Sequence, residues 1–174
     1  MATAHDLTAA GKGAQFSGGG VKYSSGPCRV GTVHLHLNIA KIVAELGVAV
    51  DPSAADTIAL WEMPIGTVIL GCLFHVVTAC TVTATAATAT MAIGDAGSAA
   101  GYLAAANMKV VGYTGMVVGD VYGAARRTIA AATDLVVVTA GTATVLLTGI
   151  IDIYLPVMFI DPIYAATIEP GSWV

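Results

Sequence analysis

Two histidines separated by one residue are the first side chains whose types and spacing could do chemistry. His34 and His36 lie in the segment VHLHLNI, where apolar and polar residues alternate. This alternation has the period of a β-strand, so both imidazoles project from one face, about 7 Å apart. A metal site needs a third ligand, and no carboxylate or cysteine lies in the adjacent sequence. We interpret the pair as part of a polar strand face and predict no metal site, although a neighbouring subunit could supply a third ligand.

The remaining polar residues predict no catalytic site. His75 lies in a long apolar run, which is typical of a buried or interfacial histidine, and no serine or cysteine occupies a nucleophile-elbow setting. The acidic residues are scattered, and several adjoin glycine or proline, where aspartate ordinarily stabilises turns. Residues 17–20 (SGGG) lack the lysine and hydroxyl of a phosphate loop. We predict no catalytic residues, no cofactor and no enzyme activity. The alternative, an enzyme with a dispersed site, requires carboxylates or histidines that converge in a pocket.

The composition narrows the class of protein. Only 10% of the residues are charged and 56% are hydrophobic, whereas soluble domains carry about 25% charged residues. A membrane protein and a subunit that buries surface against neighbours both fit this composition. The net charge of −4 gives no electrostatic footprint for nucleic acid, so we predict no nucleic-acid partner.

The uncharged segment 64–90 decides between these two classes. It is long enough to span a bilayer. Residues 81–85 (TVTAT), however, alternate with period 2, and Val, Ile and Thr suit strands better than helices. We therefore predict a sheet and no membrane partner. The sequence has neither C-x-x-C spacing nor a secretory signal at its start, so we expect reduced thiols and an origin in the cytoplasm.

The chain divides into three segments. Residues 1–31 are glycine-rich and predict a flexible N-terminal arm, residues 32–157 a β domain, and residues 158–174 a C-terminal tail. The pattern also predicts a turn of helix that ends at Gly47, a short helix within residues 99–108, and a hairpin that joins 134–139 to 143–157. Further strands are predicted at 33–39, 57–63, 67–78 and 88–93. Many short strands with little helix indicate an all-β sandwich or barrel.

Three segments of the chain resemble small virion proteins of tailed bacteriophages. These are residues 56–79, 87–105 and 134–155, and the resemblance extends over about residues 32–157. The matching residues are turn and strand positions: Pro64, Gly66, Thr67, Leu70, Gly71, Gly94, Asp95, Gly101, Tyr102, Leu103, Asp134, Gly141, Thr142 and Ala143. The alanine content and the apolar tail with two prolines depart from the pattern.

The resemblance implies a capsid decoration (cement) protein. Its expected fold is a jelly-roll-like antiparallel β-sandwich with an extended N-terminal arm and an irregular C-terminal tail. Its expected role is to bind and stabilise the head shell as a homo-oligomer, a homotrimer, with itself and the major capsid protein as partners. It would be located on the capsid surface of the virion after assembly in the host cytoplasm. The alternative is a tail, baseplate or receptor-binding component, which would show an exposed aromatic cluster; Trp61 is instead expected in the core and Trp173 at a contact with a neighbour.

Overall fold

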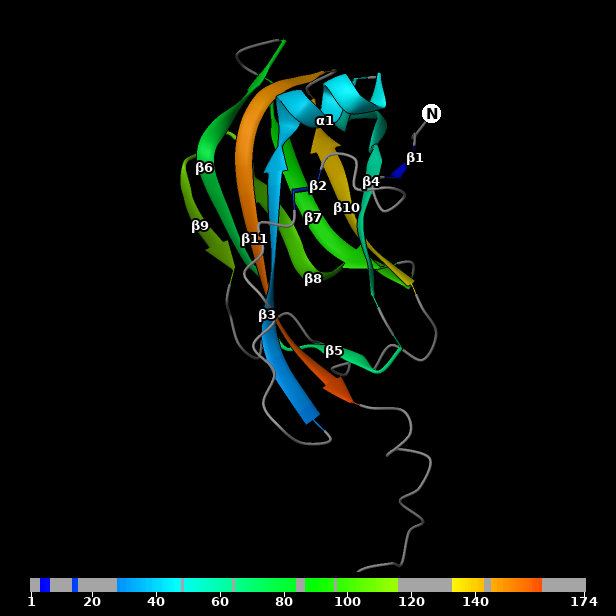
Figure 1. Cartoon of the computed structure of the whole chain (residues 1–174). Helices are drawn as coiled ribbons and strands as arrows, with labels where there is room; N and C mark the ends of the chain where they lie inside the picture. The colour runs from blue at the N-terminus through cyan, green and yellow to red at the C-terminus, as the bar shows by residue number, and fades with distance from the viewer. Residues whose placement is uncertain are drawn as a thin grey trace, which may run out of the picture.

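Two packed β-sheets make up the part of the chain that the structure describes (Figure 1). This structure is a computed structural model, and it describes residues 4–6, 14–15, 28–47, 49–63, 65–83, 87–95, 97–115, 133–142 and 145–160. The strands are β1 (Ala4–Asp6), β2 (Ala14–Gln15), β3 (Cys28–Asn38), β4 (Thr57–Met63), β5 (Thr67–Ile69), β6 (Leu73–Val82), β7 (Ala89–Asp95), β8 (Ser98–Asn107), β9 (Gly112–Gly115), β10 (Thr133–Gly141) and β11 (Leu146–Ile160). One α-helix, α1 (Ile39–Leu46), and a 3-10 helix, η2 (Pro52–Ala54), accompany them.

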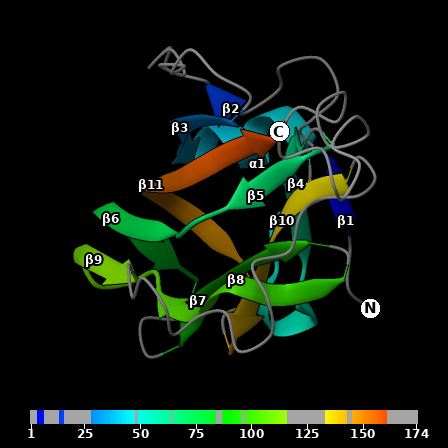
Figure 2. The same ribbon diagram turned by 90° about the horizontal axis from the view of Figure 1, so that it is seen from below.

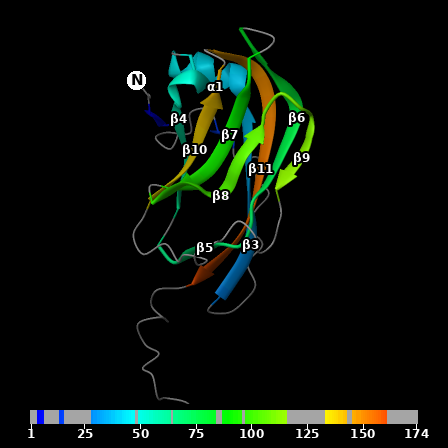
Figure 3. The same ribbon diagram turned by 180° about the vertical axis from the view of Figure 1, so that it is seen from behind.

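Most strands that are neighbours in the chain lie in different sheets. Sheet A has the order β1-β4-β10-β7-β8, and sheet B has the order β2-β3-β11-β6-β9, with β5 also paired to β11. Figure 2 views the two sheets from one end of the sandwich, and Figure 3 views the molecule from behind, with sheet A in front. All pairings are antiparallel except that of β1 with β4. The predicted all-β sandwich is confirmed.

The core lies between the sheets. Along β3, Val33, Leu35 and Leu37 are buried, while the residues between them are half-buried on the outer face. The same alternation along β4 and β7 supplies the facing side of one continuous hydrophobic cluster. Trp61, which was predicted in the core, is half-buried and packs against this cluster without being one of its buried members.

Helix α1 covers one end of the sandwich (Figure 1). The side chain of Asn38 accepts a hydrogen bond from Lys41 N–H at 3.1 Å, which caps the helix start. Gly47 ends the helix in the left-handed region (φ 66°), as the sequence predicts. None of the described helices has the length and apolarity that a membrane crossing requires.

The predicted hairpin of 134–139 with 143–157 is wrong. Strand β10 pairs with β4 and β7 in sheet A, whereas β11 pairs with β3, β5 and β6 in sheet B. The turn between them is bonded to the start of β7, because Thr142 N–H donates to the carbonyl of Thr88 at 3.0 Å. The two strands therefore take partners in opposite sheets.

The predicted helix within 99–108 is also wrong, because these residues form β8. Alanine has the highest intrinsic helix propensity, but propensity is a weak preference that tertiary pairing overrides. Here β8 pairs with β7 and buries Tyr102, Leu103 and Ala106.

The predicted strand 67–78 is divided into β5 and β6. The break at 70–72 lies beside Pro156 of β11, since Ile69 pairs with Val157 and Leu73 with Tyr154. Leu70 N–H donates to the Pro156 carbonyl at 2.8 Å. Proline has no N–H to donate to a ladder, which accounts for an interruption at this point.

Described strands extend into the segments predicted as arm and tail. Strand β3 begins at Cys28, within the predicted arm, and β11 ends at Ile160, within the predicted tail. Two pieces of the arm, β1 and β2, pair with β4 and β3 of the same chain. The other arm residues, the tail from residue 161 and Trp173 lie outside the described residues. The division into arm, domain and tail stays a prediction.

Candidate functional site on the outer face of sheet B

The register of β3 and β11 brings a carboxylate to the two histidines. His34 and His36 alternate with buried leucines on β3, so both lie on the outer face of sheet B. On β11, Asp152 pairs with His36, and Tyr154 pairs with His34. Directly opposite and diagonal residues of antiparallel strands are within reach of each other on one face. The sequence pattern therefore predicts the face correctly, and the sheet adds the partner.

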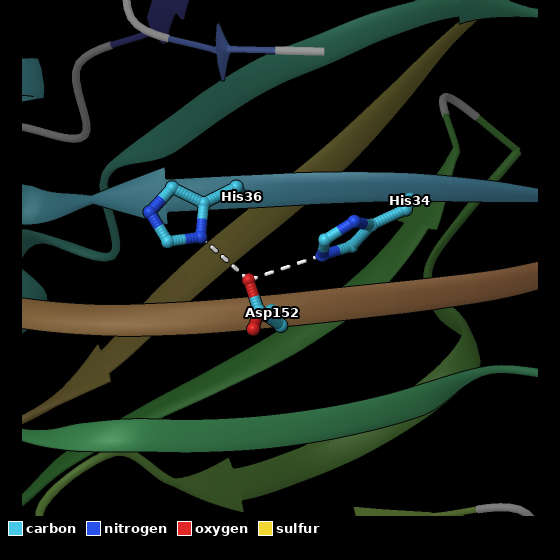
Figure 4. A network of polar contacts seen from close by, with 3 residues as sticks. All are labelled: His34, His36 and Asp152. Carbon is cyan, nitrogen blue, oxygen red and sulfur yellow. Dashed lines mark hydrogen bonds and ion pairs between the residues drawn. The ribbon is translucent and has the colours of Figure 1, made fainter. Parts of the chain in front are cut away.

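The carboxylate of Asp152 lies within ion-pair distance of both imidazoles (Figure 4). Its Oδ1 lies 2.6 Å from His36 Nδ1 and 3.1 Å from His34 Nε2. One ligand atom from each of the three residues lies within 4.8 Å of the others. All three residues are half-buried, and the Nε2 atom of His34 is itself covered. The three potential metal-ligand atoms lie close together on a face that solvent still reaches.

The electrostatics keep this carboxylate ionised. Burial raises the pKa of Asp152, but hydrogen bonds and Coulombic attraction from His36 and His34 lower it more, and the pKa is lowered overall. Each oxygen of an ionised carboxylate has more than one lone-pair site, so Oδ1 alone can face both rings.

Two stacked pairs extend the cluster along the same sheet. The ring of His34 stacks on Tyr154 with centroids 4.5 Å apart and planes 7° apart. On the neighbouring strands, His75 stacks on Tyr113 at 3.9 Å and 8°. Asp152 of β11 also pairs in register with His75 of β6. His75 is thus half-buried on the outer face, next to the three convergent residues.

The third member of the cluster was outside the reach of sequence reasoning. Asp152 lies 116 residues beyond His36, and nothing near it in the chain marks it as a ligand. The one available signal is the alternation in GIIDIYLPV, which places Asp152 and Tyr154 on a common face of a predicted strand. That signal becomes useful only when the strand is known to pair with residues 33–39.

The other candidate groups are structural where the structure describes them. Burial raises the pKa of Cys72 to about 12 and that of Cys80 to about 11. Both thiols are therefore protonated at neutral pH and are poor nucleophiles. The predicted role of aspartates beside glycine or proline is confirmed at Asp51, which caps η2, and at Asp95, which holds the β7–β8 turn.

Comparison with known proteins finds a likeness in structure but no match in sequence. No protein-family model and no curated protein matches the sequence. Among solved structures, the chain is similar to one from the "Cyanophage Pam1 capsid asymmetric unit", with 18% sequence identity and a TM-score of 0.55. The match covers 80% of this chain and 90% of that chain. At this identity the likeness establishes a shared fold, and the fold accounts for nearly the whole of the matched chain.

Proposed function

We propose that this chain is a bacteriophage capsid decoration (cement) protein, a structural and non-enzymatic component that binds and stabilises the head shell as a homotrimer. The observation that carries the proposal is the shared fold with a chain of a phage capsid. Because 90% of that chain is matched, the likeness is to a whole capsid component of similar size and not to one domain of a larger protein. The proposed partners are a second copy of the chain and the major capsid protein, on the outer surface of the virion.

The strand order supports the jelly-roll part of the proposal. Apart from the short strands β1, β2 and β5, the two layers have the orders β3-β11-β6-β9 and β4-β10-β7-β8. The first of these eight strands lies beside the last, and most connections pass from one sheet to the other. A double-sheet jelly roll wraps eight strands in this manner, and viral capsid proteins use that architecture.

The low charge and the exposed apolar side chains support a protein whose surface is covered by neighbouring subunits. The charged fraction is 10%, less than half of the usual value of about 25%. Several large apolar side chains are exposed in the single chain: Ile65, Val77, Val110, Val111, Tyr113 and Leu147. A component of a shell buries such groups against other copies and against the shell, whereas a free monomer leaves them in water.

The proposed mechanism is stabilisation by selective binding. A protein that binds the expanded shell and not its precursor shifts the equilibrium toward the expanded state by the free energy of binding. Many equivalent copies multiply a modest contact over the shell. No single chemical site is required for this activity.

Head binding is the direct test. The absolute mass of the purified protein is measured in detergent-free buffer, and the protein is then sedimented with emptied expanded heads, with precursor heads and with isolated tails of the virus that encodes it. We expect a mass of three chains, saturable binding to expanded heads, and a higher temperature of head rupture. An unrelated β-sandwich protein of similar size serves as the control.

Two results would contradict the proposal. A protein that leaves the heads unbound and sediments with tails would assign it to the tail or baseplate. A stable mass other than that of three chains would overturn the trimer while leaving the head-binding proposal to be judged by sedimentation.

A further inference from the structure

We propose that the outer face of sheet B carries a binding site for a divalent transition-metal ion of the zinc class, with His34, His36 and Asp152 as ligands. This site is independent of shell binding and goes beyond the proposed function. The sequence lacked a third ligand near the two histidines, and the pairing of β3 with β11 supplies it.

The distances between the donors suit a single ion. Zinc binds histidine nitrogen and carboxylate oxygen at about 2.0–2.2 Å, so two donors on one tetrahedral ion lie about 3.3 Å apart. Asp152 Oδ1 lies 2.6 Å from His36 Nδ1 and 3.1 Å from His34 Nε2. All three donor atoms are within 4.8 Å of one another. Both Asp152 distances are shorter than the separation of donors on one tetrahedral ion, so the rings and the carboxylate must move apart when an ion takes the place of the direct contacts.

The backbone that carries these ligands is held on both sides. Strand β3 pairs with β2 and β11, and β11 pairs in turn with β6. Directly beneath the site, Leu35 and Leu37 of β3 and Ile151 and Ile153 of β11 are fully buried. A site on rigid, well-packed strands keeps its ligands in position without the metal, which lowers the entropic cost of binding.

An aromatic partner fixes the orientation of one ligand. The ring of Tyr154 stacks on His34 at 4.5 Å, and His36 meets the edge of His34 at 6.5 Å with planes 75° apart. Contacts to a ligating histidine commonly set its ring orientation and tune its metal affinity. Tyr154 is therefore a positioning residue in this site and not a ligand.

The set of ligands selects the class of ion. Imidazole suits Zn²⁺, Cu²⁺, Ni²⁺ and Co²⁺, whereas Mg²⁺ and Ca²⁺ prefer sites built from oxygen. Two imidazole nitrogens with one carboxylate oxygen therefore favour zinc and its neighbours over the alkaline-earth ions. Three protein ligands leave at least one coordination position for water or for a donor from another molecule.

The experiment is a titration of the chelator-treated full chain with Zn²⁺. The protein carries no histidine tag, because a tag would bind the same ions. Calorimetry and equilibrium dialysis give the affinity and the number of ions per chain, in buffer that contains excess Mg²⁺. We expect one Zn²⁺ per chain, and an absorption spectrum of tetrahedral or five-coordinate Co²⁺ when cobalt replaces zinc.

The variants H34Q, H36Q and D152N remove one ligand at a time. Each is expected to weaken Zn²⁺ binding by about tenfold or more. The matched control is H75Q, since His75 is half-buried on the same face, beside Asp152 in register, but is not among the three convergent residues. Its affinity is expected to stay within about threefold of the unaltered chain. Circular dichroism and thermal unfolding confirm that each variant is folded.

Two outcomes would overturn the site. One is that the unaltered chain takes up no Zn²⁺ at about 100 µM, which corresponds to a binding free energy weaker than about −5.5 kcal/mol. The other is that the three ligand variants bind as tightly as H75Q. In either case the cluster is an ion-pair network only. Because the titration uses the free protein, its failure leaves the head-binding proposal unaffected.

Discussion

Two aspartates in this sandwich show how one side chain serves two different purposes. Asp95 lies in the β7–β8 turn, where it is buried and accepts hydrogen bonds from Gly97 N–H at 2.7 Å, Ser98 N–H at 3.1 Å and the Tyr102 hydroxyl at 2.6 Å. All three donors lie within seven residues of it along the chain. Asp152 takes its partners from a strand more than a hundred residues earlier, on a face that solvent reaches. Asp95 stabilises a local turn, whereas Asp152 contacts two histidines that only the folded sheet brings near it.

The largest expected effect is the loss of the carboxylate at Asp95. Asp95→Ala leaves two backbone N–H groups and a tyrosine hydroxyl without this acceptor at a buried position, and it should lower the free energy of unfolding by about 2–4 kcal/mol. The matched variant is Asp152→Ala, which removes a carboxylate that is half-buried on a face that solvent reaches, with an expected loss of about 1 kcal/mol or less. Urea unfolding of both variants gives the two values. If Asp152→Ala costs as much as Asp95→Ala, the distinction between the two carboxylates is wrong.

A smaller effect is expected at Gly149 of β11, where an added Cβ would meet β6. Gly149 has φ 147°, and a Cβ atom added there would lie 2.3 Å from Cys80 Sγ and 3.0 Å from Cys80 Cα. Gly149→Ala should therefore displace β11 three residues before Asp152 and cost about 2 kcal/mol of stability.

The control for this substitution is Gly47→Ala at the end of α1. Gly47 also has a positive φ (66°), but nothing lies within 4 Å of an added Cβ. The expected cost is about 1 kcal/mol, from the backbone conformation alone. Equal losses for the two variants, measured by thermal unfolding, would mean that the contact with Cys80 is unimportant for the position of β11.

The smallest expected effect concerns the thiols between the sheets. With the pKa of Cys72 raised to about 12 and that of Cys80 to about 11 by burial, neither should react with iodoacetamide at neutral pH. The measurement is the intact mass after treatment, on a Cys28→Ser background so that only these two thiols remain. Both should react fully in urea. Rapid modification without urea would show that the interior is open, in contrast to its description as a closed core.

Because burial raises the pKa of both thiols, the stability of the fold should fall at high pH. The folded pKa values lie above the ordinary value of 9.0, so the folded state holds these protons more tightly than the unfolded chain does. Their contribution to stability is complete below pH 9 and is lost as the pH rises through the folded values. A decline that begins well below this range would have to come from other groups.

Local patterns predicted the parts of the fold that local chemistry determines. The strand at 57–63, the helix end at Gly47 and the turn aspartates follow from period-2 alternation, backbone freedom and side-chain capping, which involve only nearby residues. Alternation also placed His34 and His36 on one face. It tells which face a side chain occupies, but it does not tell which strand lies alongside.

The wrong predictions have a common physical reason, which is that local patterns do not tell which strands pair. Strands β10 and β11 are adjacent in the chain and carry a turn signal, yet their partners are in opposite sheets. The alanine-rich β8 was predicted as a helix because its pairing with β7 is invisible to propensity. Asp152 was missed as a partner of the two histidines for the same cause, since its nearness to His36 depends on the register of β3 with β11.

The pairing of β3 with β11 has a consequence for how the protein is made. These strands join residues 28–38 to residues 150–160, so sheet B stays incomplete until nearly the whole described chain has left the ribosome. Contacts of such long sequence separation slow folding, and a nascent chain would expose β3 without its central partner during that time. His34 and His36 are synthesised early, but they can meet Asp152 only after more than a hundred further residues have been added.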